Sequence, residues 1–199
     1  GFYMDIYEVT MARYKKFVDA TGRPLPDNPN HPEDPYIWKN KTYPQGMEDN
    51  PVALVSYDDA AEYCKWAGKR LPTELEWEKA CRGKDALRWP WGDTIEIGRA
   101  NTRDLDLRRS SPVGGFPEDV SQYGIYDMAG NLREWTTSWY NAYPGSELKR
   151  DTFGETYKVA RGGSWVHTAM PESRCASRGI AQTWYRHRSL GFRCVKDAG

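Results

Sequence analysis

The residues with the clearest chemical potential are four cysteines, Cys64, Cys81, Cys175 and Cys194. None stands in a Cys-x-x-Cys pair or in another spacing typical of metal ligands, so the pattern does not favour zinc. Four thiols allow three disulfide pairings, and their spacing does not choose among them. Disulfides would indicate the periplasm, the cell surface or secretion, because an oxidising compartment preserves them. Four buried, reduced thiols are the alternative.

Histidine is the second candidate for chemistry, and the chain has three: His31, His167 and His187. His167 follows the sequence Gly-Gly-Ser-Trp-Val, and His187 lies in the C-terminal segment. Two imidazoles can bind a transition metal, so a site formed by His167 and His187 is one hypothesis. Hydrogen-bonded histidines without a metal are commoner and form the alternative.

The C-terminal segment combines aromatic rings with basic groups, which suits an anionic or aromatic ligand. Arginine binds carboxylate and phosphate groups through two parallel hydrogen bonds. The predicted ligand groove consists of Arg174, Arg178, Trp184, Tyr185, Arg186, His187 and Arg188. The alternative is a solvated loop whose arginines pair with nearby carboxylates.

Three acidic residues, Glu74, Glu76 and Glu78, have the appearance of an acid–base cluster. Alternate positions on a helix point in different directions, so these carboxylates do not converge. Helix capping from Thr73 and Glu76, together with compensation of the helix dipole, explains them better.

Three helices are predicted, at 10–20, 56–67 and 73–82, each with polar residues at its start and a glycine after its end. Ser56 and Asp59 have the spacing of a capping box. Residues 23–51 are rich in proline and predict an irregular surface excursion or lid. From Arg88 onward, short apolar runs interrupted by Gly, Pro, Asp and Asn predict brief strands and long ordered loops.

The balance of charge favours neither nucleic acid nor an anionic membrane, because Lys plus Arg and Asp plus Glu number 28 each. No run of 18 apolar residues is present, so no membrane span is predicted. A length of 199 residues suits one domain, 1–199, with a sizeable core.

Five segments, in order, resemble the formylglycine-generating enzyme (sulfatase-modifying factor) family, whose fold is related to C-type lectins. They are DIYEVT (5–10), NPV with SY (50–57), WAGKRLPTELEWE (66–78), YGIYDMAGN with EWT (123–136), and RGGSW (161–165) with GFRC (191–194). The resemblance implies an α+β, C-type-lectin-like domain with few short strands, about three helices and extensive ordered loops. Only the extreme N-terminal strand of the family has no counterpart.

The resemblance also implies two disulfides, Cys64–Cys194 and Cys81–Cys175. Catalytic members of the family bind copper(I) with two further cysteines, the first of which follows a Gly-Gly-Ser-aromatic-x sequence. Here His167 stands in that place, and the second cysteine has no counterpart. Copper and formylglycine generation are therefore not expected, and Ser164, Trp165 and His167 are the remaining candidates for any chemistry in that pocket.

A calcium site is implied at Asp127, Gly130, Leu132 and Glu134, where the family uses one side-chain oxygen, two carbonyls and a carboxylate. These are the hard oxygen ligands that calcium prefers. A capped loop, with an Asx-turn at Asp127, is the alternative. A second, weaker site would begin at Asn101 and Thr102 and end at Asp104 or Asp106, because the following loop is shorter than that of the family.

Three functions are compatible with this pattern. The first is a noncatalytic recognition or accessory domain that binds a small molecule, peptide or protein, or acts as a subunit of a larger assembly. The second is a divergent metal-dependent oxidoreductase of the siderophore-maturation or sulfoxide-synthase type. The third is a lectin-like binding protein of the retroelement-diversified type.

Overall fold

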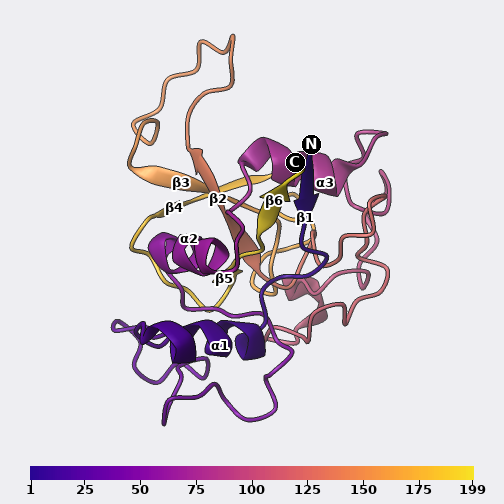
Figure 1. The fold of residues 1–199 in the computed structure, drawn as a ribbon. Coiled ribbons are helices and arrows are strands. Elements are labelled where there is room, and N and C mark those ends of the chain that lie inside the picture. Colours follow the sequence, from indigo (N-terminus) through magenta and orange to yellow (C-terminus); the bar gives the residue numbers. More distant parts are fainter.

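The computed structural model describes residues 1–199, and it has the α+β fold that the sequence predicts (Figure 1). Helices and strands are short, and ordered loops connect them. In chain order, the elements are β1 (Phe2–Met4), α1 (Met11–Thr21), α2 (Tyr57–Trp66), α3 (Glu74–Arg82), the 3-10 helix η1 (Arg103–Leu105), β2 (Arg133–Trp139), β3 (Tyr157–Arg161), β4 (Arg178–Gln182), β5 (Leu190–Gly191) and β6 (Val195–Asp197).

The three predicted helices are confirmed, and the predicted residues cap them. The Thr10 hydroxyl accepts the Arg13 N–H at the start of α1. Ser56 and Asp59 form the expected capping box of α2. Thr73 forms the corresponding box of α3. The three glutamates do not form one cluster: Glu76 pairs with Arg70, whereas Glu74 and Glu78, one helical turn apart, both contact Arg161.

A four-stranded sheet forms the centre of the molecule, with the order β4-β3-β2-β5. The β2–β3 and β3–β4 pairs are antiparallel, whereas β2 and β5 are parallel. The strands β1 and β6 form a separate antiparallel pair, so the two termini lie side by side (Figure 1). The turn after β3 and the loop between β4 and β5 supply most of the candidate site residues.

The main core lies between helices α1 and α2 and the C-terminal segment, and aromatic side chains dominate it. Tyr14 stacks on Tyr63, and Phe17 and Phe192 meet these two rings edge to face. Such pairs stabilise a core beyond the apolar area they bury. The many tyrosines and tryptophans of the sequence therefore serve packing as well as surfaces.

The two disulfides have the pairing that the resemblance implies. Cys64 of α2 is bonded to Cys194, and Cys81 of α3 is bonded to Cys175. They close loops with sequence separations of 130 and 94 residues. In the chain-entropy description, a loop of about 100 residues contributes about 4 to 5 kcal/mol. Both helices are thereby tied to the C-terminal quarter of the chain.

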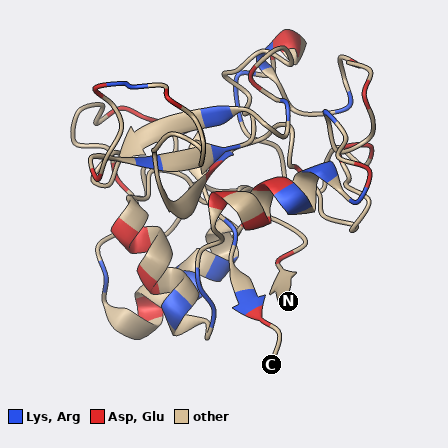
Figure 2. Ribbon diagram, turned by 90° about the horizontal axis from the view of Figure 1, so that it is seen from above, with Lys and Arg blue, Asp and Glu red and all other residues tan.

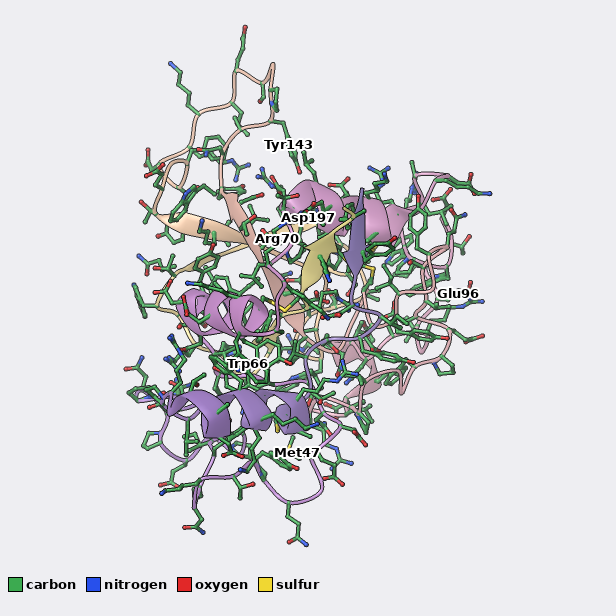
Figure 3. All side chains as sticks on the ribbon, viewed as in Figure 1. Met47, Trp66, Arg70, Glu96, Tyr143 and Asp197 are labelled. Carbon is green, nitrogen blue, oxygen red and sulfur yellow. A yellow bond between two sulfur atoms is a disulfide. The ribbon has the colours of Figure 1, made fainter.

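Two loops extend from this body. The proline-rich segment 23–51 contains no helix or strand, as predicted. The β2–β3 connection, which carries Tyr143 (Figure 3), projects from the sheet as a long arm (Figure 1). Basic and acidic residues are interspersed along the helices rather than segregated (Figure 2). None of the helices has the length and apolar character needed to cross a bilayer.

Candidate functional site

The turn after β3 carries Ser164 and His167 and lies beside Arg133, the first residue of β2. Gly162 adopts a left-handed backbone conformation with φ of 80°. A Cβ atom at Gly163 would overlap the Ala129 carbonyl and the Ser173 hydroxyl. Two glycines are therefore required for the chain to turn this tightly against its neighbours. The side chain of Ser164 is fully buried as a result.

Ser164 and His167 form a short contact, 2.6 Å between Oγ and Nδ1. Burial, followed by the nearby charge of Arg133, lowers the pKa of His167 to about 4. The imidazole is therefore neutral at physiological pH. The Ser164 hydroxyl has no other acceptor, so it donates to Nδ1, and the His167 proton resides on Nε2.

Burial and then the charge of Arg188 also lower the pKa of His187 below its ordinary value. Its Nδ1 atom accepts the Ser189 N–H, so its proton also resides on Nε2. Nowhere in the chain do three or more His, Cys, Asp or Glu side chains form a group able to hold a metal ion. The hypothesis of a His167–His187 metal site gains no support from this arrangement.

Two arginines of the predicted groove are already paired within the chain. Arg178 donates two hydrogen bonds to Glu74, at 2.8 and 2.9 Å, and lies over the rings of Tyr140 and Tyr143. Arg186 forms an ion pair of 2.6 Å with Asp59. The prediction that these guanidinium groups are available to a ligand is wrong, because carboxylates distant in sequence occupy them.

The remaining groove residues lie at the surface. Trp184 is 63% exposed, and Tyr185 stacks on His187. Arg188 lies over the ring of Trp165, and Arg174 is exposed with its Nε bonded to the Pro171 carbonyl. Next to this loop, a polar pocket of about 400 Å³ is lined by Asn28, Asn30, His31, Pro32, Glu33, Asp34, Pro35, His187 and Arg188.

A cluster of buried charge lies on the other face of β2. Glu134 is fully buried and accepts two hydrogen bonds from Arg193 and one from Trp77. Three more carboxylates, from Glu8, Asp119 and Asp127, are buried nearby. Burial raises the pKa of all three, and that of Asp127 reaches about 6. Neighbouring carboxylates add to the shifts of Glu8 and Asp119.

These carboxylates shape the loop that precedes β2. Asp119 accepts the N–H groups of Ala129 and Gly130. Glu8 accepts the Leu132 N–H and the side-chain amide of Asn131. The carbonyl groups of Gly130 and Leu132 accept no hydrogen bond from the chain, although both residues are buried. Such orphaned acceptors are costly unless a further group binds them.

Comparison with known proteins identifies this architecture. Residues 1–198 match the Sulfatase-modifying factor enzyme 1-like domain. The chain belongs to the sulfatase-modifying factor family. This confirms the resemblance seen in the five sequence segments.

Individual relatives within the sulfatase-modifying factor family differ in activity. The chain is 32% identical to the formylglycine-generating enzyme of Bos taurus over 249 residues, covering 99% of the chain and 66% of that protein. It is 34% identical to the inactive Cα-formylglycine-generating enzyme 2 of Bos taurus, covering 84% and 58%. The chain thus spans less than two-thirds of the length of either relative.

A solved structure of the same fold is PvdO from Pseudomonas aeruginosa. Its TM-score is 0.79 at 28% identity, covering 99% of this chain and 80% of PvdO.

The oxygens expected as calcium ligands are only partly used by hydrogen bonds within the chain. The orphaned carbonyls of Gly130 and Leu132 are two of the four expected oxygens. Asp127 has one carboxylate oxygen bonded to the Gly114 N–H and the other available. Oε1 of Glu134 accepts only one hydrogen bond, from Arg193, so it retains a lone pair. A divalent cation would also offset the negative charge of the four buried carboxylates, which lie near a single buried arginine, Arg193.

The second expected site fits less well. Asp106 is exposed and pairs with Arg108, so its prediction as a ligand is wrong. Asp104 accepts hydrogen bonds from Thr102 and from the Ala169 N–H. Oδ1 of Asn101 is buried without a partner, and it is the one atom here that matches the expected pattern.

Sequence reasoning missed several residues of this region. It assigned no role to Glu8, Asp119 or Arg193, although Glu8 and Arg193 lie within the segments that carry the resemblance. It also missed Arg133, whose guanidinium lies close enough to His167 to lower the pKa of the imidazole. Glu134 of the EWT segment was identified from the sequence, but its partners Trp77 and Arg193 were not.

Proposed function

We propose that this chain is a noncatalytic recognition or accessory domain built on the sulfatase-modifying factor scaffold. The observation that carries the proposal is the state of the cysteines. All four form disulfides, and no free cysteine remains. Copper(I) chemistry of the family type needs two soft thiolate ligands, which this chain does not offer.

The recognition surface in this proposal lies around the loop between β4 and β5. Trp184 offers an exposed ring face, and the adjacent pocket of about 400 Å³ offers amide, carboxylate and imidazole groups. Exposed tryptophan beside convergent polar groups is a common composition of binding sites. The disulfides further support a periplasmic, cell-surface or secreted location.

Calcium is proposed as a structural ion at Asp127, Gly130, Leu132 and Glu134. It would supply positive charge to a buried acidic cluster and fix the loop that leads into β2. The residues of this chain orient the loop, because Asp119 and Glu8 hold its N–H groups and thereby direct the two carbonyls elsewhere. Asn101 Oδ1 is the one candidate ligand for a second, weaker ion.

The metal content of the purified protein tests the proposal. We expect calcium and no stoichiometric copper or iron. Stoichiometric copper or iron would contradict the proposal and favour a divergent oxidoreductase. In that case, His167→Ala would be compared with wild type in an oxidation assay, and loss of turnover would assign the activity to the turn after β3.

A second test addresses the recognition surface directly. Trp184→Ala removes the exposed ring at the proposed surface, whereas Tyr3→Ala removes another exposed ring, on β1 and outside that surface. Both variants and the wild type would be applied to the same array of small molecules, peptides and glycans. A ligand retained by the Tyr3 variant and lost by the Trp184 variant supports the surface, and equal binding by both excludes it.

A further inference from the structure

We propose that Arg133 is the anchor for a carboxylate group of the ligand, at the turn where β2, β3 and β4 meet. This inference deepens the recognition function and rests on it for its biological meaning.

Arg133 is unusual among the basic residues of the chain. Each of the other arginine and lysine side chains that are shielded from solvent has a partner for its charge. Arg161, Arg178 and Arg193 pair with glutamates. Lys158 is enclosed by the rings of Tyr57 and Trp139. Arg133 has no carboxylate within 4 Å and no aromatic ring beneath it, although it is largely shielded from solvent.

The position of the Arg133 guanidinium is fixed, but most of its donors are free. Its Nε donates to the Gly162 carbonyl at 2.9 Å. Nη1 lies against Gly179, where any Cβ atom would overlap it. The two Nη atoms donate no hydrogen bond within the chain, and neither is fully enclosed. A guanidinium fork with unpartnered N–H groups is suited to binding a carboxylate through two parallel hydrogen bonds.

The neighbouring His167 offers a second donor of the right kind. Because Ser164 donates to Nδ1, the Nε2 atom carries the proton and has no partner in the chain. A neutral imidazole N–H adds a directional hydrogen bond to an anion. The site thus combines one permanent positive charge with one neutral donor.

The one carboxylate close to this pair is held elsewhere. Glu172 accepts hydrogen bonds from the backbone N–H and the hydroxyl of Thr168, both at 3.0 Å. Its charge influences Arg133 and His167, but it lies beyond ion-pair distance of both. The charge of Arg133 is therefore only partly balanced in the free protein, and an incoming carboxylate completes the balance.

A matched pair of probes tests the charge requirement. Arginine Nε–H signals would be followed by NMR while the full chain is titrated with benzoate and, separately, with neutral benzamide. We expect benzoate to shift the Arg133 signal saturably and benzamide to leave it unchanged. Equal responses to the two probes would overturn the proposal. A short peptide with a free C-terminus, compared with its amide, then distinguishes a peptide carboxylate from a small-molecule one.

Variants test the residue. Arg133→Gln is expected to weaken benzoate binding at least tenfold, and Arg133→Lys to weaken it less, because the charge remains while the fork is lost. Arg150→Gln, at an exposed arginine on the β2–β3 arm, changes the net charge equally and should leave binding unchanged. Glu172→Gln should strengthen binding by removing a nearby negative charge. Unaltered affinity in Arg133→Gln would assign Arg133 to a structural role.

The outcomes separate the two proposals. If copper or iron chemistry is found but benzoate binding still depends on Arg133, the recognition function fails and the carboxylate site stands. If the metal analysis shows calcium alone and benzoate does not bind, the carboxylate site fails alone. Should Arg133→Gln not fold, the wild-type titration and Arg133→Lys still decide the question.

Discussion

Arg133 and Glu134 are neighbours on β2, but the charge of Glu134 is paired within the chain and that of Arg133 is not. Successive residues of a strand point to opposite faces, so Glu134 enters the buried cluster while Arg133 faces the turn after β3. Glu134 accepts three hydrogen bonds and shares its charge with Arg193. The guanidinium of Arg133 donates one hydrogen bond, to a carbonyl, and has no ion pair. A fully paired buried charge is part of the fold, whereas a shielded charge without a partner is suited to a ligand.

The largest effect on stability is expected at Glu134, the residue with the paired charge. Glu134→Gln removes the one carboxylate within ion-pair distance of buried Arg193, and breaking such a pair costs about 3 to 5 kcal/mol. Urea unfolding monitored by tryptophan fluorescence would measure the loss. A loss of unfolding free energy below about 1 kcal/mol would mean that Arg193 finds another partner. The proposed difference between Glu134 as a structural charge and Arg133 as a binding charge would then be wrong.

Removal of calcium should produce the next largest effect. Saturation at about 100 times Kd stabilises a protein by about 2.7 kcal/mol. EDTA should therefore lower the melting temperature, and added calcium should restore it. Asp127→Ala should abolish the response to calcium, whereas Asp106→Ala should retain it because Asp106 is exposed and paired with Arg108. An EDTA-insensitive melting temperature would contradict the calcium proposal.

Acidification tests the neutral state of His167. Its pKa in the folded protein, about 4, lies below its ordinary value. Between the two values the unfolded chain binds a proton that the folded chain does not, so stability falls as pH falls from about 6.5 to 4. After allowance for partial exposure, the contribution is about 2 kcal/mol. His167→Gln should reduce this loss, and identical pH profiles for the variant and the wild type would refute it.

The smallest effect on stability is expected at Arg133. Because its charge is shielded without a counter-charge, Arg133→Gln should change the free energy of unfolding by less than about 1 kcal/mol, in either direction. Chemical denaturation beside Glu134→Gln would show the contrast between neighbouring residues. A loss as large as that of Glu134→Gln would place Arg133 with the structural charges.

The helices were predictable because their signals are local. Ser56 with Asp59, and Thr73 with Glu76, lie three residues apart, and the capping hydrogen bonds join the same residues. The strands were predictable only as a region. Strand β5 contains two residues, Leu190 and Gly191, and it exists because β2 lies beside it. Such pairing is not visible in a short sequence window.

The candidate site was predictable to a smaller extent. The disulfide pairing followed from the family resemblance, because spacing left three possibilities. The groove arginines were misassigned because Arg178 pairs with Glu74, which lies 104 residues away in the sequence. Arg133 was missed for a related reason. It stands out because no carboxylate pairs with it, and the sequence alone does not show which charges are paired.

A count of free thiols in denaturant, without reducing agent, tests the central claim most directly. If the cysteines are structural and the domain recognises a ligand instead of oxidising a substrate, we expect no reactive thiol before reduction. Four should appear after it, corresponding to Cys64, Cys81, Cys175 and Cys194. Free thiols before reduction would return soft metal ligands to the chain and contradict the account.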